Sequence, residues 1–311
     1  MIDAVKVIDA QNLPEEIVSY KAEDSVQDGV RVIRADVSSD ELVHLQLVLK
    51  ADHVPYEQYG TFDTYIGLLN HLNTDNYTTD ALTAALLDVS GGFSVNSDYM
   101  DISDGGFTPT VCISWDCLPE NIDACFELVR EIIRNTDTAD LEHARRRIAE
   151  SNQMISIYMN MDPSEILKTA LMGYVNPAQR FSALDSMGDC FEWYMNRTNW
   201  SDEELAAALK TGKEMLLDGM HKENLIVCSV SSKENNDLVV AAGLKLASEL
   251  SDEPSVHYDY TKDMAELPES IAFPMDIDVG YNGVAASYQD KIIYMFQNAK
   301  CDYRFVSNKS N

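Results

Sequence analysis

The closest approach to a metal-binding motif in this sequence is the pair Glu142-His143. Zinc hydrolases place two histidines and a glutamate within about one helical turn, as HExxH or HxxEH, because this spacing puts two metal ligands and a base on one helix face. Neither order occurs, and Ala139 stands where HxxEH would require its first histidine. A single imidazole does not hold zinc alone, so we interpret Glu142-His143 as an exposed helix face and predict no cofactor in this chain.

Other catalytic motifs are missing from the sequence as well. There is no GxSxG nucleophile elbow, no GxGxxG dinucleotide motif and no GxxxxGK[ST] phosphate loop. The run Arg145-Arg146-Arg147 fans across most of a helix circumference, which favours a solvated face over an anion site. The cysteines form no CxxC pair and are interpreted as reduced core thiols: Cys112, Cys117, Cys125, Cys190, Cys228 and Cys301. No residue is therefore assigned a catalytic step, and the substrate-binding residues stay unknown.

The charge balance limits the possible partners. Against 23 Lys and Arg stand 52 Asp and Glu, a formal net charge of -29, so we expect neither nucleic acid nor an anionic membrane as a partner. Long-range attraction would favour basic peptides, although such acidity more often serves solubility alone. The sequence shows no signal peptide and no apolar run of the roughly 18 residues that a membrane span needs. This indicates the cytoplasm, or an organelle matrix if a targeting segment lies upstream.

Hydrophobic periodicity predicts the secondary structure. Alternation of Val43, Leu45 and Leu47 with polar residues predicts a strand over 42–51. Pro55 is expected to open a helix that ends near residue 73, with Tyr59 and Phe62 on its buried stripe. Further strands are expected at 30–37, 93–97, 111–115 and 225–230, and further helices at 78–90, 119–133, 138–160, 163–175, 201–219 and 236–250. This order predicts an α+β fold in which an antiparallel sheet is covered by helices on one face.

Composition also suggests domain boundaries. Residues 1–28 are polar and irregular and are interpreted as a leader segment, followed by one α+β domain over 29–250. Residues 251–270 are acidic, contain two prolines and show no periodicity, which is typical of a linker. Residues 271–311 are too few to fold alone and are interpreted as an appendage or the incomplete start of a following domain. Limited proteolysis is expected to cut first within 251–270.

The order of motifs between residues 42 and 95 resembles a known family. An alternating strand and a helix lead to Asn73-Thr74-Asp75-Asn76-Tyr77, and a capped helix leads on to Gly91-Gly92-Phe93-Ser94-Val95. This series resembles the pitrilysin and insulinase superfamily of zinc metallopeptidases, in its presequence-protease branch. Segments 116–160 and 222–235 resemble the third domain of that branch, which opens the non-catalytic C-terminal half, and 272–285 resembles the start of the fourth domain.

The resemblance implies where the chemistry of such a peptidase would lie. Members have four similar α+β domains in two halves that close around a peptide, and only the first domain binds zinc through HxxEH. Counting back from Thr74-x-x-Tyr77 places the three functional positions of HxxEH on Thr64, Gly67 and Leu68, none of which is a histidine or a glutamate. Zinc is therefore expected in a catalytic half outside this chain, and this chain alone is predicted to be inactive.

Two functions of different classes follow from the resemblance. The leading interpretation is a non-catalytic C-terminal-half segment of a zinc metalloendopeptidase that degrades peptides, contributing to chamber enclosure and substrate binding. Its expected partners are the catalytic N-terminal half of the same peptidase and peptide substrates, with a preference for basic ones. The alternative is an inactive peptidase homologue that acts as a binding or assembly module. Whether the chain is part of an enzyme stays open on the sequence alone.

Overall fold

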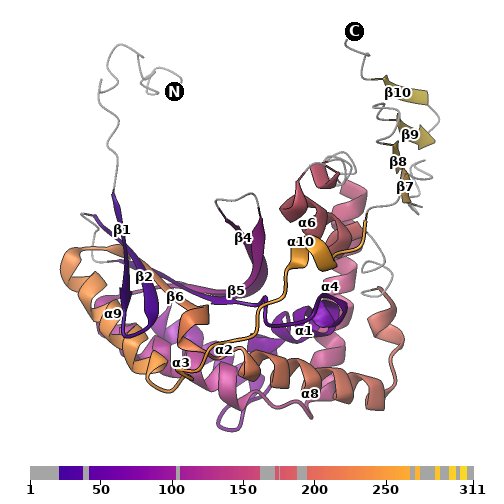
Figure 1. Cartoon of the computed structure of the whole chain (residues 1–311). Coiled ribbons are helices and arrows are strands. Elements are labelled where there is room, and N and C mark those ends of the chain that lie inside the picture. Colours follow the sequence, from indigo (N-terminus) through magenta and orange to yellow (C-terminus); the bar gives the residue numbers. More distant parts are fainter. Residues whose placement is uncertain are drawn as a thin grey trace, which may run out of the picture.

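The structure is a computed structural model of the chain. It describes residues 21–37, 42–102, 106–161, 172–174, 176–187, 195–266, 270–273, 284–287, 294–298 and 302–306. Between residues 22 and 264 the described elements build one sheet and the helices packed against it (Figure 1). The predicted α+β class is confirmed.

Six strands form the central sheet in the spatial order β1-β2-β6-β3-β5-β4. Their bounds are β1 Ala22–Gln27, β2 Val30–Asp36, β3 Val43–Lys50, β4 Gly92–Asp101, β5 Phe107–Cys117 and β6 Leu225–Ser231. Neighbouring strands pair antiparallel except β2 and β6, which run parallel. The sheet is thus mainly antiparallel, as predicted, with one parallel pair that the sequence pattern did not indicate.

The alternation along β3 sets the two faces of the sheet. Leu45, Leu47 and Leu49 are at most 6% exposed and belong to the main hydrophobic core. The register places them opposite Trp115, Ile113 and Val111 of β5, which are buried on the same face. Side chains on a strand alternate between faces, so His44, Gln46 and Lys50 point to the other side. The predicted inward set of this strand is confirmed.

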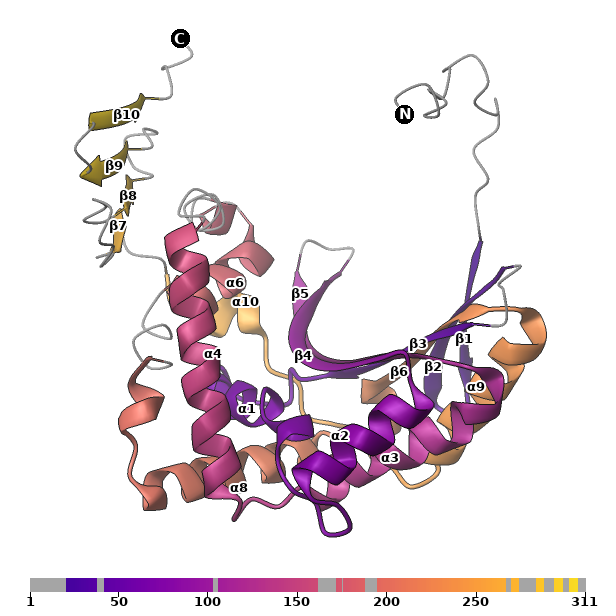
Figure 2. The ribbon, with the colours of Figure 1, turned by 180° about the vertical axis from the view of Figure 1, so that it is seen from behind.

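Helices cover the face of the sheet that carries these apolar side chains. Their bounds are α1 Tyr59–Ile66, α2 Thr79–Val89, α3 Ile122–Asn135, α4 Leu141–Met161, α6 Pro177–Met187, α8 Asp202–Asp218, α9 Lys233–Ala247 and α10 Tyr260–Asp263. Figures 1 and 2 show α2, α3, α8 and α9 along one face, while α4 and α6 stand beside the curled ends of β4 and β5. The opposite face of β2, β6 and β3 carries no helix among the residues that the structure describes.

Two predicted helix starts have the expected caps. The Thr78 hydroxyl accepts a hydrogen bond from Ala81 N at 3.3 Å at the start of α2. At the start of α8, Ser201 and Glu204 form a reciprocal capping box, with distances of 2.7 and 3.2 Å. Each cap satisfies backbone donors that the first helical turn leaves free.

The segment after Pro55 differs from the single helix that its stripe predicted. It consists of a 3-10 turn at Tyr56–Gln58, then α1, then a second 3-10 turn at Leu69–His71. Gly67 ends α1, since glycine has a low helix propensity. The predicted stripe is nevertheless buried throughout, at Tyr59, Phe62, Ile66, Leu69 and Leu72.

Parts of the predicted leader and linker pack with the core. Strand β1 lies inside the segment 1–28 and pairs along its whole length with β2. In the segment 251–270, Tyr260 is 1% exposed and Met264 is 6% exposed, and both belong to the main core. Residues 1–20 and 267–269 lie outside the described residues, so the domain boundaries themselves stay predictions.

The described C-terminal residues form two short hairpins. β7 (Ser270–Phe273) pairs antiparallel with β8 (Val284–Ser287), and β9 (Tyr294–Asn298) pairs antiparallel with β10 (Asp302–Val306). Of the segment that resembles the start of a fourth domain, 274–283 lies outside the described residues, as does most of the helix predicted at 163–175.

Candidate functional site

The three positions that the resemblance aligns with zinc-binding residues lie at the C-terminal end of α1. Thr64 is 2% exposed, and its hydroxyl donates a hydrogen bond to Gly60 O at 2.8 Å. Leu68 is also buried, and Gly67 contributes no side chain. A hydroxyl and an aliphatic side chain are not the nitrogen, sulfur and carboxylate ligands that zinc takes, so these residues do not fit the metal.

A buried arginine lies against Thr64. Arg197 is 6% exposed, and its guanidinium donates to Thr64 Oγ1 and to Asn152 Oδ1, each at 3.2 Å. Arg197 comes from a 3-10 turn at Arg197–Asn199 and Asn152 from α4, so three distant segments meet here. Sequence reasoning did not single out Arg197, because nothing in its local pattern shows that its side chain would be buried.

The pair Glu142-His143 behaves as the sequence predicted. Glu142 is exposed on α4, and His143 Nδ1 lies 2.8 Å from Asp140 Oδ1, which ties the imidazole to the start of the helix. No three His, Cys, Asp or Glu side chains gather as a metal site within the part of the chain that the structure describes. The described cysteines are free thiols, with Cys112, Cys117 and Cys125 buried, and Cys190 and Cys301 lie outside the described residues.

The turn that anchors the resemblance is held by one buried carboxylate. Glu131 of α3 is 9% exposed and accepts hydrogen bonds from Thr74 Oγ1 at 2.5 Å, Asn76 Nδ2 at 2.9 Å and Asn135 Nδ2 at 2.5 Å. Burial raises the pKa of Glu131, but these hydrogen bonds outweigh it and hold the pKa below its ordinary value. Glu131 is therefore charged at neutral pH and fixes the turn to α3.

A second set of bonds joins the same turn to α2 and α4. Asn73 Oδ1 accepts from Thr79 N at 2.8 Å, and Asn73 N donates to Asp140 Oδ2 at 2.8 Å. The motif Asn73–Tyr77 thus has a structural part to play: it connects three helices. No local pattern in the sequence paired it with Glu131 or Asp140.

The face of the sheet without helices is the larger candidate surface. Its centre is a small apolar cluster in which the register places Ile226, Val48 and Cys112 side by side on β6, β3 and β5. Polar contacts border this cluster: Gln46 Nε2 to Ser114 Oγ at 3.1 Å, His44 Nδ1 to Asp116 Oδ1 at 2.6 Å and Arg31 Nη2 to Asp24 Oδ2 at 2.7 Å. An apolar strip with flanking donors and acceptors is suited to an extended peptide.

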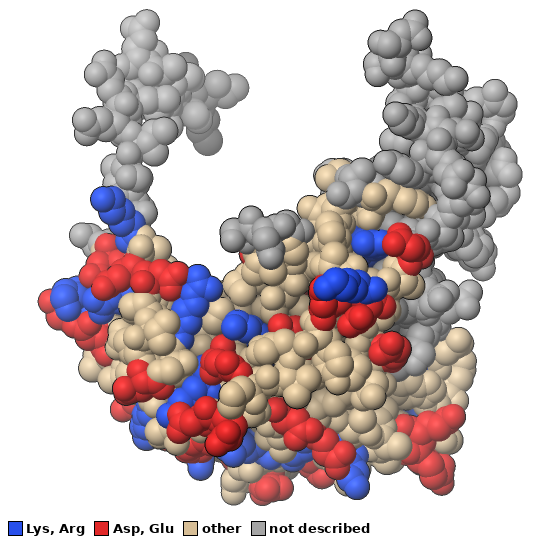
Figure 3. Space-filling view, in the orientation of Figure 1, with Lys and Arg blue, Asp and Glu red and all other residues tan. Residues whose placement is uncertain are grey.

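Charged side chains are mixed over the surface. Figure 3 shows acidic and basic side chains interspersed on the face in view. The high acidic charge therefore does not form one continuous wall on this face.

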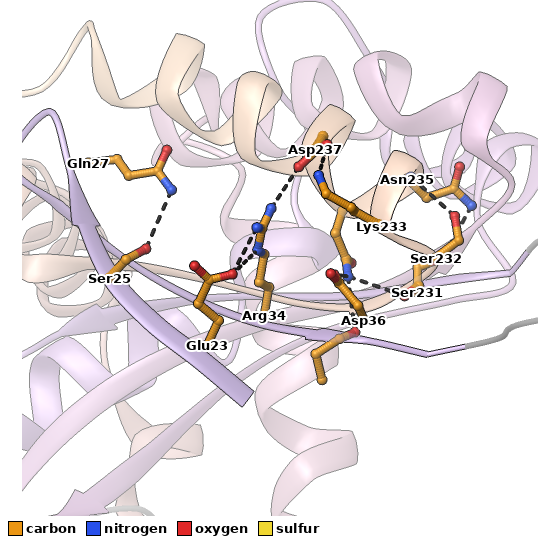
Figure 4. Close-up of polar contacts among 12 residues, drawn as sticks. Glu23, Ser25, Gln27, Arg34, Asp36, Ser231, Ser232, Lys233, Asn235 and Asp237 are labelled. Atoms are coloured by element: carbon orange, nitrogen blue, oxygen red, sulfur yellow. Dashed lines mark hydrogen bonds and ion pairs between the residues drawn. The ribbon is translucent and has the colours of Figure 1, made fainter. Parts of the chain in front are cut away.

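The outer border of the open face is fixed by a polar network between the β1–β2 hairpin and α9 (Figure 4). Arg34 bridges Glu23 at 2.8 Å and Asp237 at 2.6 Å, and Lys233 pairs with the same Asp237 at 2.7 Å. The buried Asn236 donates to Ala35 O at 3.0 Å. These bonds hold residues that the sequence analysis assigned to a leader as part of the sheet.

The fold and this surface define a peptidase-like α+β segment whose presumptive ligand positions carry no metal-binding side chains. Residues 5–185 match the family of peptidase M16 subfamily C associated segments, and because this is more than half of the 311 residues, the chain belongs to that family. The M16 part of the resemblance is thereby confirmed. None of the described helices is both long and apolar enough to cross a membrane.

Two individual proteins are similar to this chain. Protein HypA of Clostridium perfringens (strain 13 / Type A) is 18% identical over 235 residues, which is 75% of this chain and 24% of that protein. The chain thus spans about a quarter of this curated relative. A crystal structure of a peptidase M16 inactive domain from Pseudomonas fluorescens is similar at a TM-score of 0.49 and 12% identity, over 81% of this chain and 54% of the other.

Proposed function

We propose that this chain is a non-catalytic segment of the C-terminal half of an M16 zinc metalloendopeptidase, in the presequence-protease branch, and that it helps to enclose and bind the peptide substrate. The observation that carries the proposal is the combination of membership in the M16-associated family with Thr64, Gly67 and Leu68 at the ligand positions. Such a segment needs a partner that holds the zinc. We propose the catalytic N-terminal half of the same peptidase for that part, in the cytoplasm or in an organelle matrix.

The open sheet face supports the substrate-binding part of the proposal. Its apolar cluster at Val48, Cys112 and Ile226 offers contact to apolar side chains, and the Gln46 and Ser114 polar groups lie next to it. Neither helix layer nor core needs these outward groups, so they are available for a ligand. Peptides, basic ones included, are the proposed ligands of this face.

Reconstitution tests the proposal. The chain is mixed with a separately produced catalytic half that contains HxxEH, and complex formation is measured by analytical ultracentrifugation alongside cleavage of a quenched fluorogenic peptide. We expect a one-to-one complex whose activity clearly exceeds that of the catalytic half alone. The absence of a complex would contradict the proposal, and a complex without any gain in activity would favour the assembly module instead.

A matched pair of variants tests the open face. Gln46→Trp places a large ring on this face and is expected to raise the KM for a long peptide several-fold without preventing the complex. Leu238→Trp, at an exposed position of α9 on the helical layer, is the control and is expected to leave the KM unchanged. Equal effects of the two variants would contradict substrate binding at the sheet.

A further inference from the structure

A trough runs between α2 and α3 on the helical layer, away from the open sheet face. Both views show these two helices side by side (Figures 1 and 2), and the space between them has a volume of about 440 Å³. Its walls include Ala85 and Val89 of α2 and Ala124 and Leu128 of α3. The two alanines are too small to fill the space between the helices, which leaves a partly apolar floor open to solvent.

Both ends of the trough are held by specific bonds. At one end, Cys125 Sγ of α3 donates to Val89 O, the last residue of α2, at 3.5 Å. At the other end, Glu131 of α3 fixes Asn76 and Thr74, which precede α2. The helices are therefore kept at a fixed separation, and a ligand would meet a preformed groove, which lowers the cost of binding.

The rim of the trough is acidic. Asp88, Glu127 and Glu131 line it, and among the described residues of the lining Arg130 is the one basic side chain. The Arg130 guanidinium pairs with Glu249 at 2.9 Å, beyond the end of α9. Glu127 pairs with Lys245 at 3.0 Å, but both side chains are more than half exposed, and such surface pairs hold only weakly.

We propose that this trough binds a basic amphipathic helix of a partner polypeptide. An aliphatic side chain of the partner lies over Ala85 and Ala124, and flanking lysines or arginines face Asp88 and Glu127. Charge complementarity selects this occupant, because the described lining carries three carboxylates against one guanidinium that already has a carboxylate partner. The 11 residues of α2 extend roughly 16 Å, enough for about three turns of a partner helix.

The trough is on a different face from the open sheet, so this proposal does not depend on the proposed function. Loss of trough binding would leave reconstituted peptide cleavage unchanged.

The probe for the test is a fluorescein-labelled helical peptide of about 15 residues, with leucines at positions i and i+4 and lysines beside them. Its binding to the full chain is measured by fluorescence anisotropy at several salt concentrations. We expect saturable binding that weakens as salt rises. A scrambled peptide of the same composition, which has no single apolar face, is expected to bind at least tenfold more weakly.

Two kinds of variant locate the site. Ala124→Trp fills the trough from an exposed position and is expected to weaken binding at least tenfold. The double variant Asp88→Asn/Glu127→Gln is expected to weaken it several-fold and to reduce its salt dependence. The control Glu203→Gln/Asp218→Asn makes the same change of charge on exposed positions of α8 and is expected to bind like the parent chain.

Several outcomes would overturn the proposal. Unchanged binding to Ala124→Trp would exclude the trough, and equal weakening by both double variants would show attraction to the acidic surface as a whole. Concentration-dependent dimerisation that Ala124→Trp abolishes would make a second copy of this chain the occupant instead. Circular dichroism of each variant shows whether it is folded, and the charge variants keep the test decisive if Ala124→Trp is not.

Discussion

The guanidinium of Arg197 donates a hydrogen bond to Thr64 Oγ1 at 3.2 Å, at the position where the resemblance to zinc peptidases places the first metal-binding histidine. Both side chains are buried. In this chain the C-terminal end of α1 therefore contributes to the connection of α1 with the Arg197 turn and α4. The position that the resemblance assigns to a metal ligand serves as a packing contact here.

Thr64→Val tests this contact by removing the hydroxyl while keeping the shape of the side chain. It takes one acceptor away from the buried guanidinium, so we expect the free energy of unfolding to fall by about 1–3 kcal/mol. Thr64→Ser, which keeps the hydroxyl, is the control and should lose less. Urea denaturation measures both, and equal stability of Thr64→Val and the parent chain would contradict a structural part for the Arg197 bond.

Metal analysis tests the expected lack of zinc. Protein purified without a histidine tag is expected to contain far less than one zinc per chain, because Thr64, Gly67 and Leu68 offer no set of ligands. Mass spectrometry of metal content gives the measurement, with dialysis against a weak chelator beforehand. A tightly held stoichiometric zinc, or peptidase activity of the chain alone that a strong chelator removes, would refute this prediction.

The Glu131 carboxylate is expected to make stability depend on pH. Its pKa is lower in the folded chain than in the unfolded one, so its contribution is present above the unfolded pKa of about 4.3 and is lost as the pH falls through the folded pKa. Glu131→Gln should lower the free energy of unfolding by about 1–3 kcal/mol at pH 7. The difference between the two proteins should shrink below about pH 4, and a constant difference across this range would contradict the assignment.

The packing of Tyr260 predicts how residues 251–266 respond to proteases. Its ring is buried, and its hydroxyl donates to Val54 O at 2.7 Å, which fastens this segment to the core. Tyr260→Ala should cost about 3–5 kcal/mol of local stability and accelerate cleavage within 251–266. Tyr260→Phe loses only the hydrogen bond, about 1 kcal/mol, and should be cut nearly as slowly as the parent chain. Equally fast cleavage of all three proteins would support an undocked linker.

The contact of α1 with α8 depends on a glycine. A Cβ at Gly212 would lie 2.3 Å from Tyr65 Cβ, so Gly212→Ala must push the two helices apart. We expect a loss of about 1–3 kcal/mol, although alanine has the higher helix propensity. Gly67→Ala is the control, because the added carbon would lie 3.6 Å from its nearest neighbour, an ordinary contact. A stabilised Gly212→Ala variant in thermal unfolding would contradict this account.

Local patterns predicted the elements of this chain well. The alternation of Val43, Leu45 and Leu47 predicted β3 and its inward face, and Ser201 with Glu204 predicted the start of α8. Both signals depend only on residues a few positions apart, within one strand or one helical turn. The ordered motifs around Thr74 and Tyr77 likewise carried the resemblance to M16 peptidases.

Tertiary structure decided the long-range relations. Strand β6 inserts between β2 and β3 and pairs parallel with β2, and β1 joins the sheet from a segment with no strong pattern. The burial of Arg197 against Thr64 and of Glu131 beneath the Thr74 turn brings together side chains from distant segments. Such contacts depend on how whole elements pack and not on the spacing of nearby residues. The sequence by itself therefore determined which helices and strands form, and only the packed sheet and helices determined which charged groups are buried.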